Sequence, residues 1–212
     1  MSLSPELRDR LSSLVRTEQV FLFMKGNRDS PQCGFSAAVV KILDSLVPEY
    51  GTLDVLAEPE IRTGIKEFSE WPTIPQLYIR GEFVGGSDIV REMHESGELH
   101  QALGLTMPEP IAPQLKITDE AAAVLRQALQ GSQDQCFHLS IDALFRNSLS
   151  LAPRQGGEVE VDVKGITVLL DPESAARAAG VSLHVEQTGE GPRLALENPN
   201  APSFDERPEK RG

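Results

Sequence analysis

Apolar residues in the first hundred positions alternate between helical spacing and the continuous runs of buried strands. A helix is expected to open at Ser4, a favourable N-cap residue, because apolar residues follow it at helical spacing up to Val15. Further helices are expected from Cys33 to Leu46, over 59–68 and from Ile89 to about Leu103, and strands over 19–24, 52–56, 76–79 and 82–84. This order predicts a small mixed sheet flanked by helices.

A proline-rich segment divides the chain. Three prolines within 106–113 predict an extended linker. The linker separates a first domain, 1–105, from a second domain, 114–201. The remaining residues, 202–212, are charged and contain proline, so we expect a mobile tail there.

The second domain has a different pattern, with short β-type runs in the majority. Thr118 should cap a helix that continues to about Leu129, and a shorter helix should open at Pro172 and end near Gly180. The predicted strands cover 137–141, 148–151, 158–163, 166–170, 181–186 and 193–197. The pattern therefore predicts a small β-rich domain with a few helices.

Charge and cysteine content narrow the functional classes. The chain has 212 residues, of which 25% are charged, and a net charge of −12. This acidity runs through both halves and disfavours nucleic acid and anionic membranes as partners. The N-terminus lacks the pattern of a signal peptide, and no apolar run approaches the roughly 20 residues of a membrane span. Two cysteines far apart do not form a disulfide framework, so we expect a reducing cytoplasm.

Cys33 is the first candidate for chemistry, because it lies where a loop becomes a helix. The free N–H groups and the dipole at a helix N-terminus favour a thiolate and lower its pKa. Lys25, at the end of the preceding strand, could add a positive charge. The alternative is that Cys33 is a small buried apolar residue with no chemical role.

Four separated motifs favour the reactive interpretation. They are Met24-Lys25-Gly26, Pro31-Gln32-Cys33-Gly34-Phe35-Ser36, Trp71-Pro72-Thr73-Ile74-Pro75-Gln76-Leu77 and Gly81-Glu82-Phe83-Val84-Gly85-Gly86-Ser87-Asp88. Together and in this order they resemble the CGFS-type monothiol glutaredoxins over residues 4 to about 104. The resemblance implies an α/β thioredoxin-like fold for the first domain.

The resemblance also implies a glutathione site. Its residues would be Lys25, Cys33, Phe35, Arg62, Ile74, Gly86, Ser87 and Asp88. Lys25 and Arg62 would hold the glycyl carboxylate, and the backbone of Ile74, before a cis Pro75, would pair with the extended tripeptide. N–H groups at Ser87 and Asp88 would take the γ-glutamyl carboxylate, and Asp88 would take its ammonium group. Each residue alone could be a surface charge or a turn, so the assignment depends on their joint order.

Ser36 occupies the position of the second thiol of a dithiol site. Cys33 therefore cannot form the internal disulfide that reduces protein disulfides, although it could exchange with glutathione mixed disulfides. Each iron of a [2Fe–2S] cluster needs two ligands besides the sulfides. Two copies of Cys33 and two glutathiones would supply all four in a cluster-bridged homodimer. The resemblance also suggests a BolA-like partner and apo iron–sulfur proteins as recipients.

Three functions thus compete on the sequence alone. The first is an iron–sulfur carrier, which is not an enzyme in the ordinary sense. The second is a glutathione-dependent oxidoreductase, and the third is a regulatory or scaffold protein in which the second domain dominates. The absence of a second thiol favours the first over the second.

The second domain resembles, more distantly, the A-type iron–sulfur carriers (HesB-like), which implies a β-rich α+β fold. The matching segments are 115–122, 165–172 and 197–201. That family uses three cysteines, but neither 142–147 nor the tail after Ala201 contains one, and Cys136 is out of register. We therefore expect a retained fold without the metal site. His138 and His184 remain weaker candidates as ligands.

Overall fold

The computed structural model describes residues 3–130, 134–189 and 191–202. The chain divides into two compact units, with the boundary between Met107 and Pro108. Apart from Pro202, the tail predicted over 202–212 lies outside the described residues. None of the helices in the described ranges is long and apolar enough to cross a membrane.

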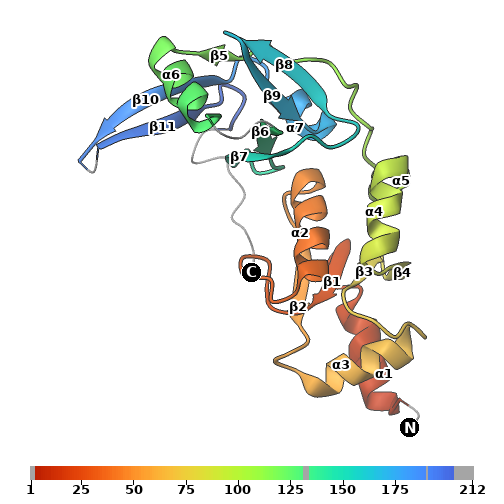
Figure 1. The fold of residues 1–212 in the computed structure, drawn as a ribbon. Helices are drawn as coiled ribbons and strands as arrows, with labels where there is room; N and C mark the ends of the chain where they lie inside the picture. The colour runs from red at the N-terminus through yellow and green to blue at the C-terminus, as the bar shows by residue number, and fades with distance from the viewer. Residues whose placement is uncertain (1–2, 131–133, 190, 203–212) are drawn as a thin grey trace. The chain divides into compact units, whose positions relative to one another are not determined.

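The N-terminal unit contains one sheet of four strands with the order β2-β1-β3-β4 (Figure 1). The strands are β1 (Val20–Met24), β2 (Gly51–Asp54), β3 (Gln76–Ile79) and β4 (Glu82–Gly85). β1 is parallel to β2 and antiparallel to β3, so the sheet is mixed, as the sequence predicts. The helices are α1 (Pro5–Leu14), α2 (Gly34–Leu46), α3 (Pro59–Phe68), α4 (Ser87–Ser96) and α5 (Glu98–Leu103).

Both faces of this sheet are covered, which explains why every residue of β1 is buried. Leu22 and its neighbours on one face pack with residues of α2, α4 and α5. Phe21 and Phe23 on the other face pack with residues of α1 and α3. α2 thus lies on the sheet through a continuous apolar stripe, and its N-terminus is fixed at the end of β1 (Figure 1).

The predicted elements of this unit are confirmed, with one correction. The helix expected from Ile89 to Leu103 is two helices, α4 and α5. Gly97 separates them because it adopts a left-handed conformation, with φ of 82°, which an α-helix cannot continue through. Its N–H donates to the His94 carbonyl at 3.2 Å and closes the last turn of α4.

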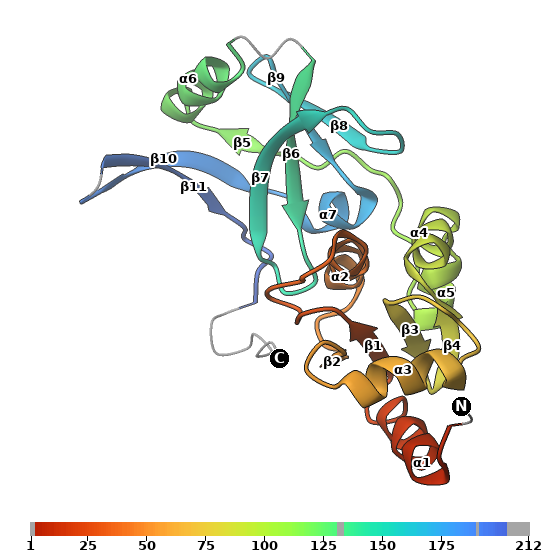
Figure 2. The same cartoon turned by 60° about the horizontal axis from the view of Figure 1, so that its bottom comes forward.

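The C-terminal unit is β-rich, as predicted, and contains two sheets (Figure 2). One sheet has the order β7-β6-β9-β8, and the other has the order β11-β10-β5. The strands are β5 (Lys116–Ile117), β6 (Gln135–Ile141), β7 (Asn147–Pro153), β8 (Val159–Val163), β9 (Ile166–Leu170), β10 (Ser182–Thr188) and β11 (Gly191–Glu197), and the helices are α6 (Asp119–Ala128) and α7 (Pro172–Arg177).

Two short elements of this unit differ from expectation. β5 has only two residues and pairs in parallel with β10, a long-range contact that no local pattern reveals. α7 ends at Arg177 rather than near Gly180. The helix starts are as expected, because the Thr118 and Asp171 side chains accept hydrogen bonds from the N–H groups of Ala121 and Ser174.

Leu43 tests whether the packing of α2 on the sheet carries the stability of the N-terminal unit. It is fully buried in the α2 face of the core. Leu43→Ala should lower the free energy of unfolding by about 2–5 kcal/mol, because it removes apolar contacts and leaves a cavity. Trp71 is the only tryptophan of the chain and lies in this unit, so its fluorescence during urea unfolding reports the change.

Leu56→Ala is the matched control, since Leu56 is exposed. It should change stability by no more than about 0.5 kcal/mol. Equal effects of the two substitutions would contradict the described packing of α2.

Candidate functional site

A pocket of about 610 Å³ lies in the N-terminal unit, where four segments of the fold meet. We call it the Cys33 pocket. Its lining residues are Lys25, Cys33, Phe35, Arg62, Lys66, Trp71, Pro72, Thr73, Ile74, Pro75, Gly86, Ser87, Asp88 and Ile89. The structure therefore brings all the residues of the predicted glutathione site together in one cavity.

Cys33 is the N-cap residue of α2, with an extended backbone, and its side chain is partly exposed. The backbone N–H of Ser36, in the first turn of α2, favours the thiolate and is the main cause of a lowered pKa of Cys33. The N–H of Phe35, the charge of Lys25 and the Ser36 hydroxyl act in the same direction, while slight burial opposes them. The helix start thus favours an accessible thiolate.

Ser36 occupies a fully buried position beneath Cys33. Its hydroxyl oxygen accepts a hydrogen bond from the backbone N–H of Lys25 at 3.2 Å. This bond ties the end of β1 to the first turn of α2. Among the residues that line the Cys33 pocket, Cys33 is the only thiol.

Positive side chains line the α3 side of the pocket. Lys25 and Arg62, the predicted pair, are joined there by Lys66. The sequence analysis did not assign Lys66. The signal was present, however, because residues four apart on a helix share a face and Arg62 and Lys66 both belong to α3. This side of the pocket is suited to a carboxylate.

The start of α4 also lines the pocket. Gly86 is its N-cap, so the N–H groups of Ser87 and Asp88 belong to the first turn, where a helix offers no carbonyl partner. Such groups bind anions. A side chain at position 86 would be tightly packed here, since an added Cβ would lie 3.0 Å from Trp71 Nε1.

Asp88 is already paired in this structure. Its Oδ1 accepts a hydrogen bond from Arg91 Nη2 at 2.5 Å, but the two side chains are 78% and 60% exposed. An ion pair this exposed is worth little, so a ligand ammonium group can compete for the carboxylate.

The segment from Trp71 to Pro75 forms another part of the pocket wall. The peptide bond between Ile74 and Pro75 is cis, which confirms the expectation from the motif. Gln76 is fully buried, and its side-chain NH₂ group donates to the carbonyls of Trp71 and Thr73, each at 3.1 Å. Gln76 therefore supports the wall from behind, a role that the sequence analysis did not assign.

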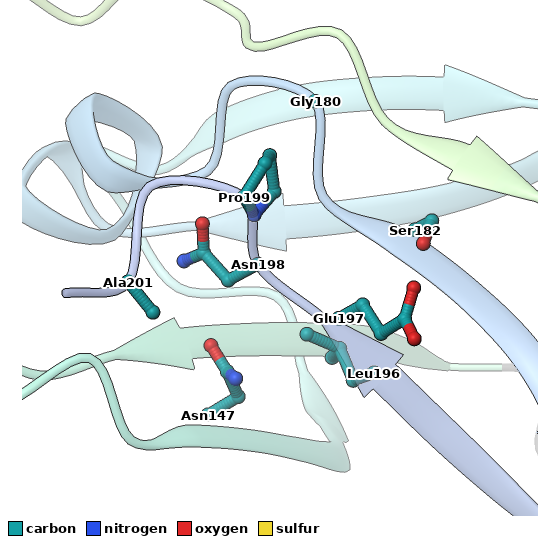
Figure 3. A pocket seen from close by; sticks show the side chains of 8 residues that line it. All are labelled: Asn147, Gly180, Ser182, Leu196, Glu197, Asn198, Pro199 and Ala201. Atoms are coloured by element: carbon teal, nitrogen blue, oxygen red, sulfur yellow. The ribbon is translucent and has the colours of Figure 1, made fainter. Parts of the chain in front are cut away.

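The C-terminal unit has a pocket of its own, of about 510 Å³ (Figure 3). It is lined by Asn147, Gly180, Ser182, Leu196, Glu197, Asn198, Pro199 and Ala201. No cysteine or histidine is among these residues. The Asn200 side chain donates to the carbonyls of Arg177 and Ala179 and so fixes the loop that forms one wall.

The weaker candidates of this unit do not converge. His138 Nδ1 lies 2.7 Å from Glu158 Oε1, and its Nε2 lies 3.2 Å from the Ala152 carbonyl, so the ring has structural partners. His184 lies beside Glu186 on β10, and Cys136 is a partly exposed free thiol on β6. Within the described part of the chain, no group of three or more His, Cys, Asp or Glu side chains could hold a metal ion.

The N-terminal half of the chain is similar to known glutaredoxins. A glutaredoxin family model matches residues 20–84. An uncharacterized ycf64-like monothiol glutaredoxin of Synechocystis sp. is 53% identical over 105 residues, which are 50% of this chain and 98% of that protein. Chloroplastic monothiol glutaredoxin-S7 of Oryza sativa is 54% identical over 105 residues, which are 50% of this chain and 62% of that protein.

Among solved structures, the solution structure of reduced poplar apo GrxS14 is 49% identical in sequence. The match covers 49% of this chain and 95% of the poplar chain, with a TM-score of 0.44. The matched share is thus about half of this chain in each of these comparisons.

Both sequence identity and the geometry of the site indicate the family of the N-terminal unit. The Synechocystis protein is matched over nearly its whole length at 53% identity. In the matched unit, Cys33 begins α2 beside a cis proline, and Ser36 stands where a dithiol site would have its second cysteine. Through its N-terminal unit, the chain belongs to the monothiol glutaredoxins.

Proposed function

We propose that this protein binds glutathione in the Cys33 pocket and carries a [2Fe–2S] cluster between two copies of the chain. The observation that carries the proposal is a single accessible thiol of lowered pKa in a pocket with complementary ends for a charged tripeptide. Membership of the monothiol glutaredoxins supports a function related to iron–sulfur clusters.

Glutathione fits the chemistry of this pocket. Its glycyl carboxylate would lie against Lys25, Arg62 and Lys66, and its γ-glutamyl carboxylate would accept hydrogen bonds at the start of α4. The backbone of Ile74 would pair with the extended peptide. The glutathione thiol would then lie on the Cys33 side, beside the exposed ring of Phe35.

The number of thiols in two copies of the pocket, each with a bound glutathione, matches the number of ligands of a [2Fe–2S] cluster. A [2Fe–2S] cluster takes four protein or glutathione ligands. Each copy of the chain would contribute Cys33, and each bound glutathione would contribute one more sulfur. A homodimer therefore completes the ligand set, and the cluster is cargo to be passed to an apo iron–sulfur protein.

The second unit is included in the proposal as a docking module. We propose that residues 114–201 form a degenerate HesB-like domain that contacts a donor or recipient of the cluster. A BolA-like protein is the further partner that the family relationship suggests.

A second candidate function is glutathione-dependent thiol–disulfide exchange. The observation in its favour is the same accessible Cys33 with a lowered pKa, because the thiolate is the attacking species. The lack of a second thiol in the pocket restricts this chemistry to mixed disulfides with glutathione. Rapid turnover of a glutathionylated substrate by the protein without iron would favour this function.

Anaerobic reconstitution tests the main proposal. With iron, sulfide and glutathione, the protein should give a visible absorption band that elutes as a dimer in size-exclusion chromatography. Cys33→Ser should remain colourless, because the only thiol of the pocket is lost. Cys136→Ser is the matched control and should bind the cluster as the parent does.

Cluster binding that survives Cys33→Ser, or that disappears only in Cys136→Ser, would place the metal outside the Cys33 pocket and refute the proposal.

The positive side of the pocket generates a prediction on affinity. Arg62→Gln should weaken glutathione binding by about fivefold, the upper range for an ion pair accessible to solvent. Isothermal titration calorimetry measures this on the protein without iron. Lys41→Gln, which removes an exposed charge from α2 outside the pocket, is the control and should leave the affinity unchanged. Equal losses in both variants would indicate a general charge effect instead.

The lowered pKa of Cys33 generates a prediction on pH dependence. In a Cys136→Ser background, the rate of Cys33 alkylation should rise with pH, because the thiolate is the reactive form. The pH at which the rate is half-maximal should lie below that of an ordinary cysteine, since the pKa of Cys33 is lowered. Lys25→Met should move the midpoint upward, since it removes a charge that favours the thiolate. A midpoint that is lower in Lys25→Met than in its parent would contradict the described electrostatics.

A further inference from the structure

Arg28 is the most deeply buried charged side chain near the site, and the functions above do not use it. It belongs to the loop 25–32, which connects β1 to Cys33 and α2. Its side chain is only 1% exposed. A buried guanidinium group is retained only where partners compensate for its lost hydration.

Those partners all come from the far end of α2 and the segment after it. Arg28 Nε donates to Asp44 Oδ1 at 2.7 Å, and Nη1 donates to the Pro48 carbonyl at 3.0 Å. The guanidinium carbon lies 4.2 Å from the centre of the Tyr50 ring. The Tyr50 hydroxyl donates to the same Asp44 oxygen at 2.8 Å and so fixes the carboxylate.

The hydrogen bonding of Arg28 is nevertheless incomplete. Its Nη2 is buried and has no hydrogen-bond partner among the described residues. An unpaired buried donor costs free energy, which the bonds to Asp44 and the Pro48 carbonyl offset. The contacts of Arg28 therefore act between the loop and the end of α2.

The rest of the loop is held mostly by bonds within itself, with one further bond to β2, from the Gly26 N–H to Asp54 Oδ1 at 2.9 Å. Gly26 and Pro31 form an isolated β-bridge, and the Gln32 N–H donates to the Lys25 carbonyl at 2.9 Å. The Asn27 side chain accepts hydrogen bonds from the N–H groups of Asp29 and Ser30. These short-range bonds shape the loop, but Arg28 is the side chain that ties its tip to the body of α2.

We propose that Arg28 is a positioning residue, which holds the loop 25–32 against α2 so that Lys25 and Cys33 keep their places in the pocket. Lys25 connects the loop directly to the site. The Lys25 N–H fixes the Ser36 hydroxyl beneath Cys33, and the Lys25 side chain lines the pocket. Release of the loop tip would loosen both ends of the loop, and ligand-binding geometry tolerates only small displacements.

The test uses the full chain without iron, in a Cys136→Ser background. Arg28→Met keeps an unbranched apolar chain but is shorter and removes the charge and the donors. We expect three changes: faster amide hydrogen exchange at 27–30 and at Gln32, a glutathione dissociation constant raised by about tenfold, and an upward shift in the pH midpoint of Cys33 alkylation. Arg8→Met removes an exposed charge of α1 and should change none of these.

Conservative variants separate positioning from bulk stability. Arg28→Lys keeps the charge but lacks the planar fork that reaches Asp44 and Pro48 together, so its effects should be intermediate. If Arg28 acts through Asp44, the effects of Arg28→Met and Asp44→Asn on glutathione affinity should not add in the double variant. Should Arg28→Met fail to fold, Tyr50→Phe removes only the hydroxyl bond to Asp44 and should shift the same readouts in the same direction, by less.

The proposal is overturned if folded Arg28→Met or Tyr50→Phe keeps the parent's exchange rates, affinity and alkylation midpoint, even where its stability falls. The inference depends on the proposed glutathione site only for its affinity readout. Should the parent itself not bind glutathione, the proposed function fails, while hydrogen exchange and the alkylation midpoint still decide the role of Arg28.

Discussion

The electrostatic effect of the first turn of α2 on the Cys33 sulfur is the interaction on which the site depends. The N–H groups of Ser36 and Phe35 have no carbonyl partner within the helix, and both favour the thiolate and lower the pKa of Cys33. This arrangement needs α2 to be fixed on the sheet, and Leu43 and its neighbours provide that packing. It also needs a fixed loop before Cys33, which the Arg28–Asp44–Tyr50 group supplies in our proposal. The position of the Cys33 thiol therefore depends on both the packing of α2 and the loop before it.

The second constraint is the number of thiols. A buried serine hydroxyl at position 36 supports Lys25 and Cys33 but cannot resolve a mixed disulfide. In the proposed function, this pocket with one thiol obtains its second sulfur from a ligand. Glutathione would bring two carboxylates for the charged and N–H groups of the pocket and a thiol beside Cys33. The charge pattern of the Cys33 pocket and the ligand requirement of a [2Fe–2S] cluster thus support the same conclusion.

Much of this arrangement could be predicted from sequence, because it depends on local signals. Apolar spacing gave the order of the elements, and Cys33 could be placed at a helix start from the loop residues before it. Gly97 was misread, since a glycine inside an apolar pattern can either continue or end a helix, and only its left-handed φ decides. Lys66 could have been assigned from its helical spacing to Arg62, whereas Gln76 and Arg28 act through contacts fixed by tertiary structure. A charged residue in a loop predicts a solvated side chain, yet Arg28 is buried against residues 16 to 22 positions away.

The most direct test of the account is native mass spectrometry of the anaerobically reconstituted protein. We expect one dominant species that contains two chains, two irons, two sulfides and two glutathiones. Removal of glutathione from the buffer should return the mass to that of the protein without iron. A cluster carried by a single chain, or by a dimer without glutathione, would contradict the claim that Cys33 and the glutathione thiol complete the ligand set together.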